Sequence, residues 1–367
     1  MKILWLFNHP APYKVDFFNE LGKSVDLTVI FERPSESDRG SSFYHSKPKN
    51  FKTVFLKHLN LGIRNNIAFG AKKYLKKHEE YDFIVINGWS SITEMGALRY
   101  LKRKKIPYVF AINGGIIPKK ESNAKKRLKD KMIGGAAYYL CPDHESEKYL
   151  IHYGAKGGTI HLFPYSTVFE KEILSEPLKE EEKKRIKEEL GVKEKEIYTA
   201  VGAFIERKNN LYLIDEIWKN VDSSKHLYLL GNGPLKNEYL EEISKNHLQN
   251  VHILPFQDKA TVLKFLSISE ASLFLTKEDI YGHVLNESLS QATPVIASDR
   301  SNSAKHLISQ GENGYVFSLE QKDEIIAAIN KPIDEGMRKN AIATAKENTI
   351  EKMSDNHLSF FSSIIKA

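Results

Sequence analysis

Short apolar runs alternate with helical patterns along almost the whole chain, and this alternation constrains the fold more than any other feature. The apolar runs that resemble strands cover residues 2–8, 26–32, 83–88, 108–114 and 136–142, then 197–204, 226–233, 251–256, 271–276 and 293–298. Between them, apolar residues recur at spacings of three and four over residues 13–23, 91–105, 209–220 and 259–269. This order predicts an α/β protein with two units, each built on a parallel sheet.

The length of 367 residues also indicates two domains, because a single hydrophobic core rarely grows beyond about 250–300 residues. The charged stretch 169–195 is the expected linker and includes a surface helix. We predict an N-terminal Rossmann-like domain over 1–168 and a C-terminal one over 196–349. The last segment, 350–367, is predicted to be a helix that crosses back to the first domain.

The composition, with 41% hydrophobic and 28% charged residues, is that of an ordinary globular protein. No run of about 18 apolar residues indicates a membrane span, and the apolar part of residues 1–14 is too short for a secretory signal. Cys141 is the only cysteine, which excludes an intramolecular disulfide and fits a reducing compartment. We therefore expect a cytoplasmic protein.

The net charge of +7 is distributed unevenly. Residues 1–170 carry 28 Lys and Arg against 16 Asp and Glu, whereas residues 171–367 carry 26 against 31. The basic runs 72–77, 101–105 and 119–131 are either solvated helix faces or a surface that attracts anionic lipid headgroups or a pyrophosphate-bearing substrate. The second interpretation places the protein at the cytoplasmic face of a membrane. Nucleic acid is not an expected partner, because no stacking aromatic residues are interleaved with these runs.

In parallel sheets, ligands bind beyond the carboxyl ends of the strands, so the loops there carry the functional prediction. The stretch 276–299 places Asp279 in such a loop and Glu287 in the helix that follows. With a helix beginning at Gly282, Glu287 lies about 7.5 Å along its axis. Backbone N–H groups over 282–284 would suit a diphosphate, Glu287 a ribose diol, and Asp279 a sugar. The alternative is that both carboxylates serve only helix capping and the helix dipole.

Other loops of the second half add suitable groups. Arg207 and Lys208 follow a predicted strand and would bring two cations to the same edge, where a charge-assisted hydrogen bond contributes about 1.5–3 kcal/mol. An ordinary surface turn is the alternative for this pair. Gly231 lies in a second glycine-rich turn, which is a weak signal because any tight turn favours glycine. Phe256 ends another strand, where a nucleotide base could rest.

Five motifs, VGAFIERKN, LGNGPL, DIYGHVLNE, ATPVIASD and GENGYVF, occur in this order over residues 201–317. The set resembles the C-terminal half of retaining glycosyltransferases with the GT-B fold, in particular the family 4 enzymes of bacterial polysaccharide and glycolipid synthesis. In the first half, HPAPYKVDFF and INGGIIPKK are similar to the acceptor-side loops of capsule and O-antigen enzymes. The resemblance implies two Rossmann-like domains whose parallel sheets face a central cleft.

Residue by residue, the resemblance implies that Glu287 binds the donor ribose and that Asp279 contacts the transferred sugar. Lys208 would neutralise the diphosphate, with Arg207 as the second cation. The other implied donor-site residues are Gly202, Gly231, Phe256, Glu278, Gly282, His283 and Val284. The chain departs from the family pattern at Ala203, where a basic residue is common, and at Asn113, where histidine is frequent. Glu278 stands beside Asp279, which leaves open which carboxylate reaches the sugar.

The implied reaction moves a sugar from a nucleoside diphosphate sugar, which we expect to be a UDP-sugar, to a hydroxyl group with retention of configuration. The acceptor would be a glycan or a lipid-pyrophosphate-linked glycan of bacterial surface polysaccharide synthesis. Its expected contacts in the first domain, each with a packing or turn role as the alternative, are His9, Tyr13, Trp89, Asn113 and Gly114. No Asp-x-Asp sequence occurs, so no metal cofactor is expected.

Two hypotheses from other classes stay open at this point. The chain could be a catalytically silent sugar-nucleotide-binding partner subunit, with Asp279 and Ala203 as marks of lost activity. It could also be another GT-B enzyme, such as a nucleotide-sugar epimerase, although we find no matching set of histidine and carboxylate residues. Donor hydrolysis or sugar transfer by the isolated protein separates the partner subunit from the transferase.

Overall fold

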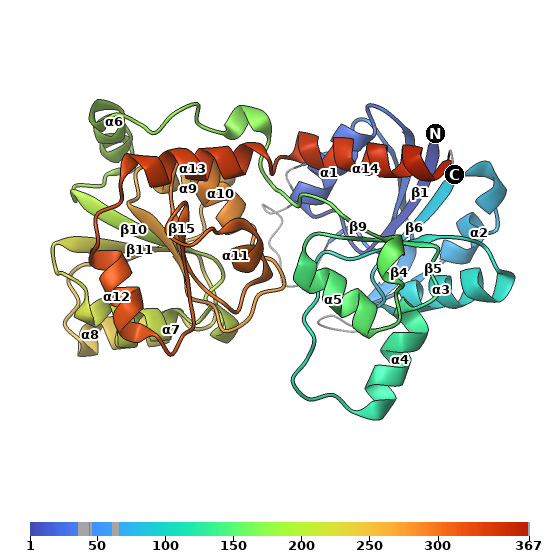
Figure 1. Cartoon of the computed structure of the whole chain (residues 1–367), viewed down its shortest axis with the longest axis horizontal. Coiled ribbons are helices and arrows are strands. Elements are labelled where there is room, and N and C mark those ends of the chain that lie inside the picture. The colour runs from blue at the N-terminus through green and yellow to red at the C-terminus, as the bar shows by residue number, and fades with distance from the viewer. Residues whose placement is uncertain (36–43, 45, 61–65, 366–367) are drawn as a thin grey trace. The chain divides into compact units, whose positions relative to one another are not determined.

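The computed structural model describes residues 1–35, 44, 46–60 and 66–365. The chain forms two compact units, one from residues 1–167 together with 350–367 and the other from residues 168–349 (Figure 1). Each unit has its own parallel sheet. Within the described ranges, no helix is both long enough and apolar enough to cross a membrane.

The sheet of the N-terminal unit has the strand order β3-β2-β1-β6-β7-β8-β9, and all neighbouring strands run parallel. These strands are β1 (Lys2–Phe7), β2 (Asp26–Phe31), β3 (Lys52–Phe55), β6 (Phe83–Asn87), β7 (Val109–Ala111), β8 (Tyr138–Cys141) and β9 (Ile160–Leu162). A separate antiparallel pair consists of β4 (Lys57–Asn60) and β5 (Asn66–Phe69). Because β1, β6 and β7 are consecutive in the sheet, the loops that follow them emerge side by side at one edge.

Strand β1 shows why the central strands are mainly apolar. Leu4 and Leu6 belong to the hydrophobic cluster on one face of the sheet. Trp5 and Phe7 contact Phe18 from the other face, with ring centroids 5.3 Å and 5.8 Å away. Successive side chains of a strand point to opposite faces of the sheet. A strand whose two faces are both covered by helices therefore buries most of its side chains and favours apolar residues at them.

Helices cover both faces of this sheet (Figure 1). One face carries α1 (Pro12–Leu21) and α14 (Ile350–Ile365), and His357 of α14 lies 4.8 Å from Phe17 between ring centroids. The other face carries α2 (Ala71–Leu75), α3 (Ile92–Lys104), α4 (Asn123–Ile133) and α5 (His144–His152). The C-terminal helix is therefore part of the core of the N-terminal unit. Short 3-10 turns lie at His78–Glu80 and Gly157–Thr159.

The sheet of the C-terminal unit has the order β12-β11-β10-β13-β14-β15 and is also parallel. Its strands are β10 (Glu196–Val201), β11 (Lys225–Leu230), β12 (Val251–Leu254), β13 (Ala271–Phe274), β14 (Val295–Ser298) and β15 (Gly314–Phe317). The central pair, β10 and β13, is far apart in sequence but adjacent in the sheet. Their following loops therefore lie next to each other at the carboxyl edge.

The helices of the C-terminal unit also form two layers (Figure 1). One face of the sheet packs against α7 (Asn210–Tyr212), α8 (Lys236–Lys245) and α12 (Lys322–Asn330). The opposite face packs against α6 (Glu180–Leu190), α9 (Lys259–Ser267), α10 (Val284–Ser290), α11 (Asn302–Leu307) and α13 (Glu335–Lys346). Further 3-10 turns lie at Glu170–Glu172, Glu206–Lys208 and Trp218–Asn220, and a π-helical segment covers Leu213–Ile217.

The predicted α/β fold with two parallel sheets is confirmed, and all ten predicted strands are present. The alternation of the sequence does not reveal β3, β4, β5, β9 and β15, which are short. The single helix predicted over 209–220 is wrong in type, because the segment is α-helical, then π-helical, then 3-10. Its apolar residues are nevertheless buried, since Leu213, Ile214, Ile217 and Trp218 are at most 1% exposed.

Two glycines fix the loops at the carboxyl edge of the C-terminal sheet. Gly202 follows β10 directly and donates its N–H to the carbonyl of Leu230, while Gly231 follows the adjacent β11. A Cβ atom on Gly231 would lie 1.9 Å from the carbonyl oxygen of Gly202. The φ angle of Gly231 is +157°, a value that L side chains rarely adopt. This glycine therefore serves close backbone packing as well as a tight turn.

We expect Gly231→Ala to destabilise the C-terminal unit by more than about 2 kcal/mol, because the clash involves backbone atoms that cannot rotate away. Gly96→Ala in helix α3 is the matched control, since its added Cβ meets no atom within 4 Å. The control should stabilise the protein slightly, by about 0.5–1 kcal/mol. Chemical denaturation of both variants measures the difference, and equal stabilities would contradict this account.

A charged group is buried in the N-terminal unit at a position that the sequence analysis does not single out. Lys14 of α1 is 2% exposed, and its Nζ atom lies 4.5 Å from the ring centroid of Tyr165. The rings of Phe7 and Phe17 are the other aromatic neighbours of this ammonium group. Burial lowers the pKa of Lys14 to about 7. The cation–π contacts recover only part of the cost of removing the charge from water.

Lys14→Met should stabilise the N-terminal unit at pH 6 by about 1–3 kcal/mol, since it removes a buried charge. Lysine in the unfolded chain keeps its ordinary pKa of 10.5, so the cost of burial is complete below pH 7 and declines as the pH rises above that value. The advantage of the variant should therefore shrink between pH 7 and pH 10. Calorimetric unfolding at several pH values, with Lys73→Met on the exposed side of α2 as the control, measures this. A variant that is less stable than the wild type at pH 6 would refute the prediction.

Candidate functional site

The predicted cations meet the predicted carboxylate at the carboxyl edge of the C-terminal sheet. Arg207 and Lys208 lie in the 3-10 turn after β10, and Asp279 lies in the loop after β13. The Nη1 atom of Arg207 and the Nζ atom of Lys208 are each 2.7 Å from the same carboxylate oxygen, Oδ2 of Asp279. The side chains of Asp279 and Lys208 are 8% and 14% exposed, whereas that of Arg207 is 50% exposed. We call these three residues the ion triad.

Asp279 stays ionised in this environment. Burial alone would raise the pKa of its carboxyl group, but the charges and hydrogen bonds of Lys208 and then Arg207 outweigh burial and hold the pKa below its ordinary value. The second oxygen, Oδ1, accepts the backbone N–H of Tyr281 at 3.2 Å. Both oxygens therefore have partners, and the carboxylate orients the two cations.

Backbone hydrogen bonds join the two loops that carry the ion triad. The hydroxyl of Thr276 donates to the carbonyl of Arg207 at 2.6 Å, and the N–H of Lys277 donates to the same carbonyl at 2.8 Å. The side chain of Asn209 donates to the carbonyl of Leu275 at 3.0 Å. Sequence reasoning missed Thr276 and Asn209, although the adjacent strand ends were a signal that their loops would meet.

The side chain of Lys208 also packs against uncharged neighbours. Its Nζ atom lies 4.5 Å from the ring centroid of Phe274, the last residue of β13. A Cβ atom on Gly202 would lie 3.5 Å from Cε of Lys208, so the glycine and the lysine are close neighbours. Asp279 thus binds Lys208 from one side while Phe274 and Gly202 pack against it.

The loop before α10 is anchored by two serines that the sequence analysis did not consider. Ser301 and Ser303 are fully buried, and both hydroxyl groups donate to the carbonyl of Tyr281. A Cβ atom on Gly282 would lie 2.8 Å from Cζ of Phe274 and 3.1 Å from the Ser303 hydroxyl oxygen. Only glycine fits there. Both serines lie just beyond the ATPVIASD motif, which ends at Asp299, so no motif of the sequence analysis includes them.

The predicted helix start at Gly282 is wrong. Gly282 has a φ angle of +95°, which a right-handed helix cannot accommodate, and α10 begins at Val284. Glu287 is therefore the fourth residue of the helix, about 4.5 Å along its axis instead of about 7.5 Å. It lies in the first turn and is half-buried. The buried face is as expected, with Leu285 and Leu289 fully covered.

The other predicted donor-site residues have different surroundings. Gly231 lies against Gly202, and His283 is half-buried with its ring 5.2 Å from that of Tyr281. Val284 is buried as the first residue of α10. Phe256 follows β12 and is 59% exposed, so a planar ligand could stack on it. Glu278 is exposed, in contrast to the buried Asp279 next to it.

The predicted acceptor residues share the carboxyl edge of the N-terminal sheet. They follow β1, β6 and β7, three consecutive strands, and are His9, Tyr13, Trp89, Asn113 and Gly114. His9 lies 3.2 Å from the Tyr44 hydroxyl through its Nδ1 atom. Trp89 Nε1 is 3.4 Å from the hydroxyl of Tyr149, and Tyr13 packs edge-on against Tyr165.

Asn113 has a buried carbonyl oxygen with no hydrogen-bond partner in the part of the chain that the structure describes. The neighbouring Gly114 has a φ angle of +141°. Gly115 must be glycine, because a Cβ atom there would lie 2.5 Å from Cγ of Tyr149. An unsatisfied buried acceptor costs about 1–3 kcal/mol, so a polar ligand that donated to Asn113 would recover this energy.

Two carboxyl groups at the same edge were missed by sequence reasoning. Glu32 follows β2 and Glu94 lies in the first turn of α3, and Ser91 bonds both, through its hydroxyl to Glu32 at 2.6 Å and through its N–H to Glu94 at 2.9 Å. Burial raises the pKa of Glu32 to about 7. Burial and then the charge of Glu32 raise the pKa of Glu94 to about 8. The pair therefore holds at least one proton near neutral pH.

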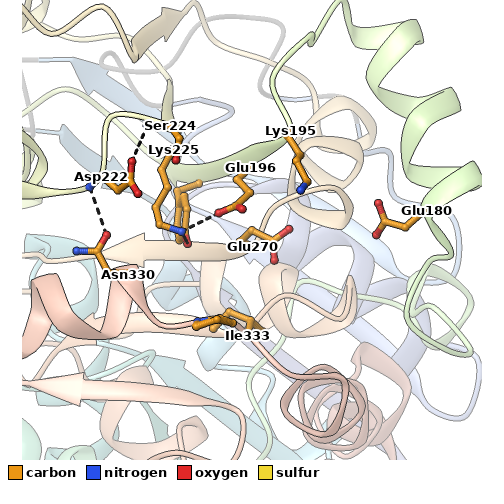
Figure 2. Close-up of a pocket in the computed structure, with 11 residues that line it drawn as sticks. Glu180, Lys195, Glu196, Asp222, Ser224, Lys225, Glu270, Asn330 and Ile333 are labelled. Carbon is orange, nitrogen blue, oxygen red and sulfur yellow. Dashed lines mark hydrogen bonds and ion pairs between the residues drawn. The ribbon is translucent and has the colours of Figure 1, made fainter.

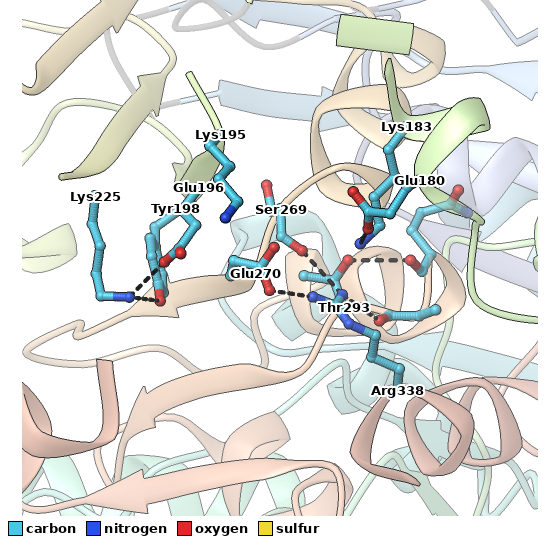
Figure 3. A network of polar contacts seen from close by, with 12 residues as sticks. Glu180, Lys183, Lys195, Glu196, Tyr198, Lys225, Ser269, Glu270, Thr293 and Arg338 are labelled. Atoms are coloured by element: carbon cyan, nitrogen blue, oxygen red, sulfur yellow. Dashed lines mark hydrogen bonds and ion pairs between the residues drawn. The ribbon is translucent and has the colours of Figure 1, made fainter. Parts of the chain in front are cut away.

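A cavity of about 690 Å³ lies at the opposite, amino-terminal edge of the C-terminal sheet (Figure 2). Its lining is charged and includes Glu196 and Lys225, which form an ion pair of 2.7 Å. Behind it, Arg338 binds Glu270 at 2.5 Å and donates to the carbonyl of Ser269 at 3.2 Å (Figure 3). No predicted site residue lines this cavity. Several of its charged groups have ion-pair partners, either within the lining, as Glu196 and Lys225 do, or just outside it, as Glu270 has in Arg338.

Comparison with known proteins gives matches to part of the chain at the sequence level. Residues 182–348 match the family model described as glycosyl transferases group 1. The amylovoran biosynthesis glycosyltransferase AmsD of Erwinia amylovora is 30% identical over 154 residues, which are 41% of this chain and 43% of that protein. The N-acetylgalactosamine-N,N'-diacetylbacillosaminyl-diphospho-undecaprenol 4-alpha-N-acetylgalactosaminyltransferase of Campylobacter jejuni is 26% identical over 154 residues, 41% of each chain. The match thus spans less than half the length of these relatives.

Comparison of structures extends to the whole chain. The crystal structure of Alr3699/HepE from Anabaena in complex with UDP and glucose superposes with a TM-score of 0.75 at 16% sequence identity. The alignment covers 99% of this chain and 100% of that one. Such low identity establishes the fold alone, and the predicted GT-B fold class is thereby confirmed. The ion triad and α10 therefore lie in a segment that matches the group 1 glycosyltransferase family model, within a chain of GT-B fold.

Proposed function

We propose that the chain is a retaining glycosyltransferase that moves a sugar from a nucleoside diphosphate sugar to a hydroxyl of a glycan or lipid-linked glycan. The observation that carries the proposal is the ion triad, in which two cations converge at the carboxyl edge of the C-terminal sheet. This is the edge where α/β sheets bind ligands. The triad also lies inside the segment that matches the family model.

The chemical difficulty of such a transfer is the departure of a nucleoside diphosphate while positive charge develops on the sugar. Lys208 and Arg207 would stabilise the negative charge that collects on the diphosphate, and because Asp279 already orients them, little reorganisation is needed. Two fixed cations supply the charge that a metal ion would otherwise bring, so we propose a metal-independent transfer. Asp279, buried against both cations, acts in this proposal as a positioning residue that keeps them in place.

The ribose, the base and the sugar of the donor are assigned to α10, the loop before it and Phe256. Glu287 in the first turn would accept hydrogen bonds from the ribose, and Phe256 is exposed enough for a base to stack on it. Gly282, His283 and Val284 would approach the sugar and phosphates through their backbone. We propose a UDP-sugar as the donor, since the similar Anabaena structure is a complex with UDP and glucose.

The acceptor is proposed to bind the carboxyl edge of the N-terminal sheet. Asn113 supports this, because its unsatisfied carbonyl oxygen could accept a hydrogen bond from an acceptor hydroxyl. The name of the Campylobacter relative specifies a diphospho-undecaprenol-linked acceptor, and AmsD is named for amylovoran biosynthesis. We therefore propose an acceptor of bacterial surface polysaccharide synthesis. The basic helix α4, Asn123–Ile133, would attract the anionic surface that carries such an acceptor.

Lys208→Ala should lower kcat/KM for sugar transfer by about 100- to 1000-fold, the range for the loss of one preorganised donor. Lys277→Ala is the matched control, because Lys277 lies in the adjoining loop and its side chain forms an ion pair with the exposed Glu206. The control should keep its rate within about twofold. Donors are first selected from a panel of nucleoside diphosphate sugars by thermal stabilisation. Equal rates for wild type and Lys208→Ala would remove Lys208 from the mechanism.

Asp279→Asn should change the affinity for UDP and the rate of sugar transfer in opposite directions. The amide keeps the shape of the carboxylate and the bond to Tyr281 but no longer neutralises Lys208 and Arg207. We expect UDP to bind several-fold more tightly, because the diphosphate no longer competes with a carboxylate, while transfer slows because the cations lose their orientation. Calorimetric titration with UDP and steady-state kinetics measure the two effects. Weaker UDP binding together with unchanged kcat would contradict the positioning role.

A catalytically silent partner subunit is the second candidate, and the closed ion triad is the observation in its favour, since it holds Asp279 away from solvent. A protein of this kind would bind UDP-sugars and show the thermal stabilisation. It would neither hydrolyse the donor nor transfer sugar to any acceptor. Donor turnover by the purified chain therefore decides between the two.

A further inference from the structure

Three metal-ligating side chains converge at the amino-terminal edge of the C-terminal sheet, outside the candidate donor site. Glu194 lies in the turn between α6 and β10, His226 is the second residue of β11, and His252 is the second residue of β12. One ligand atom from each residue lies within 4.8 Å of the other two. We propose that these residues form a binding site for a divalent transition-metal ion such as Zn²⁺.

The distances between the ligand atoms suit one small cation. Nδ1 of His226 is 3.0 Å from Nε2 of His252, and that nitrogen is 3.9 Å from Oε1 of Glu194. In a tetrahedral zinc site, ligand bonds of about 2.0–2.2 Å place neighbouring ligand atoms about 3.3–3.5 Å apart. The observed distances lie on either side of this value. Shifts of a few tenths of an ångström in the side chains would complete the geometry.

The surroundings hold the ligands in place. The hydroxyl of Tyr228 donates to Oε2 of Glu194 at 2.6 Å, which leaves Oε1 directed to the histidines. The ring of Tyr228 stacks on His252 with a centroid distance of 4.5 Å, and the rings of His226 and His252 are stacked at 5.3 Å. Tyr228 and His252 are direct partners in the β11–β12 register, so the sheet itself fixes this arrangement. Partners of this kind are typical of metal ligands.

The ligand types select the metal. Two imidazoles and one carboxylate suit Zn²⁺, Co²⁺ or Ni²⁺, whereas Mg²⁺ and Ca²⁺ prefer oxygen ligands alone. A cation bound to both nitrogens would replace the hydrogen bond that now joins them, and the imidazole that donates this bond would carry its proton on its other ring nitrogen instead. Three protein ligands also leave one tetrahedral position for water.

The position of this site indicates a structural role. The six-residue strand β10 separates it from the loop of Lys208, a length of about 20 Å. The metal would therefore take no part in sugar transfer. It would instead tie the turn after α6 to the strands β11 and β12, of which β12 is the edge strand of the sheet.

The test is a calorimetric titration of the full-length chain, without a histidine tag, with Zn²⁺, and with Mg²⁺ as a second probe. We expect one equivalent of Zn²⁺ to bind and Mg²⁺ not to bind. At a Zn²⁺ concentration 100 times the Kd, the unfolding temperature of the C-terminal unit should rise by about 5–10 °C. Co²⁺ in place of Zn²⁺ should give the visible absorption of a four- or five-coordinate site with nitrogen and oxygen ligands. These readouts are independent of transferase activity.

Variants assign the binding to the three residues. His252→Gln and His226→Gln should weaken Zn²⁺ binding by more than about 100-fold, and Tyr228→Phe by about 10- to 100-fold. His247→Gln is the matched control, since His247 is exposed and outside the cluster, and it should bind like the wild type. Circular dichroism of each metal-free variant establishes that it folds. Failure of the wild type to bind one equivalent, or equal binding by folded His252→Gln, would overturn the proposal.

Discussion

The adjacency of β10 and β13 is the constraint on which the candidate donor site depends. These strands are separated by some seventy residues of chain, yet their parallel pairing brings the turn of Lys208 against the loop of Asp279. Hydrogen bonds from Thr276 and Asn209 then fix the backbone of both loops. Because these hydrogen bonds fix the backbone of both loops, the three side chains of the ion triad lie close together once the sheet has formed. Electrostatic preorganisation of this kind costs nothing at the moment of reaction, since it is established when the sheet folds.

The sequence was sufficient for the fold class, because strands buried on both faces are mainly apolar runs, as 3–7 and 271–274 are. It was less informative for edge strands such as β3 and β9, where few apolar residues are needed. The sequence did not predict the backbone conformation of single residues. The left-handed φ of Gly282 moved the start of α10 by two residues and with it the position of Glu287. Loop contacts made by Ser301 and Ser303 depend on which strands are adjacent, which no local pattern encodes.

Buried charge is distributed differently in the two units. In the C-terminal unit, Asp279 is compensated by two cations, so burial does not neutralise it. In the N-terminal unit, Lys14 is surrounded by aromatic rings. The carboxyl groups of Glu32 and Glu94 share hydrogen bonds to Ser91, and the one cation near them is Arg33, 3.7 Å from Glu32 among the ion pairs between described residues. These groups reduce stability, because each is charged at some pH without full compensation. Natural chains keep such groups where function requires them, and all three lie in or next to elements that carry the predicted acceptor residues.

The π-helical segment Leu213–Ile217 lies between the turn of Lys208 and strand β11. A π turn contains about one residue more than an α turn, and π segments occur mostly as single-turn bulges inside α-helices. Here the buried apolar side chains on either side of the bulge still reach the core. The segment therefore widens the chain between the cationic turn and strand β11 without removing its apolar side chains from the core.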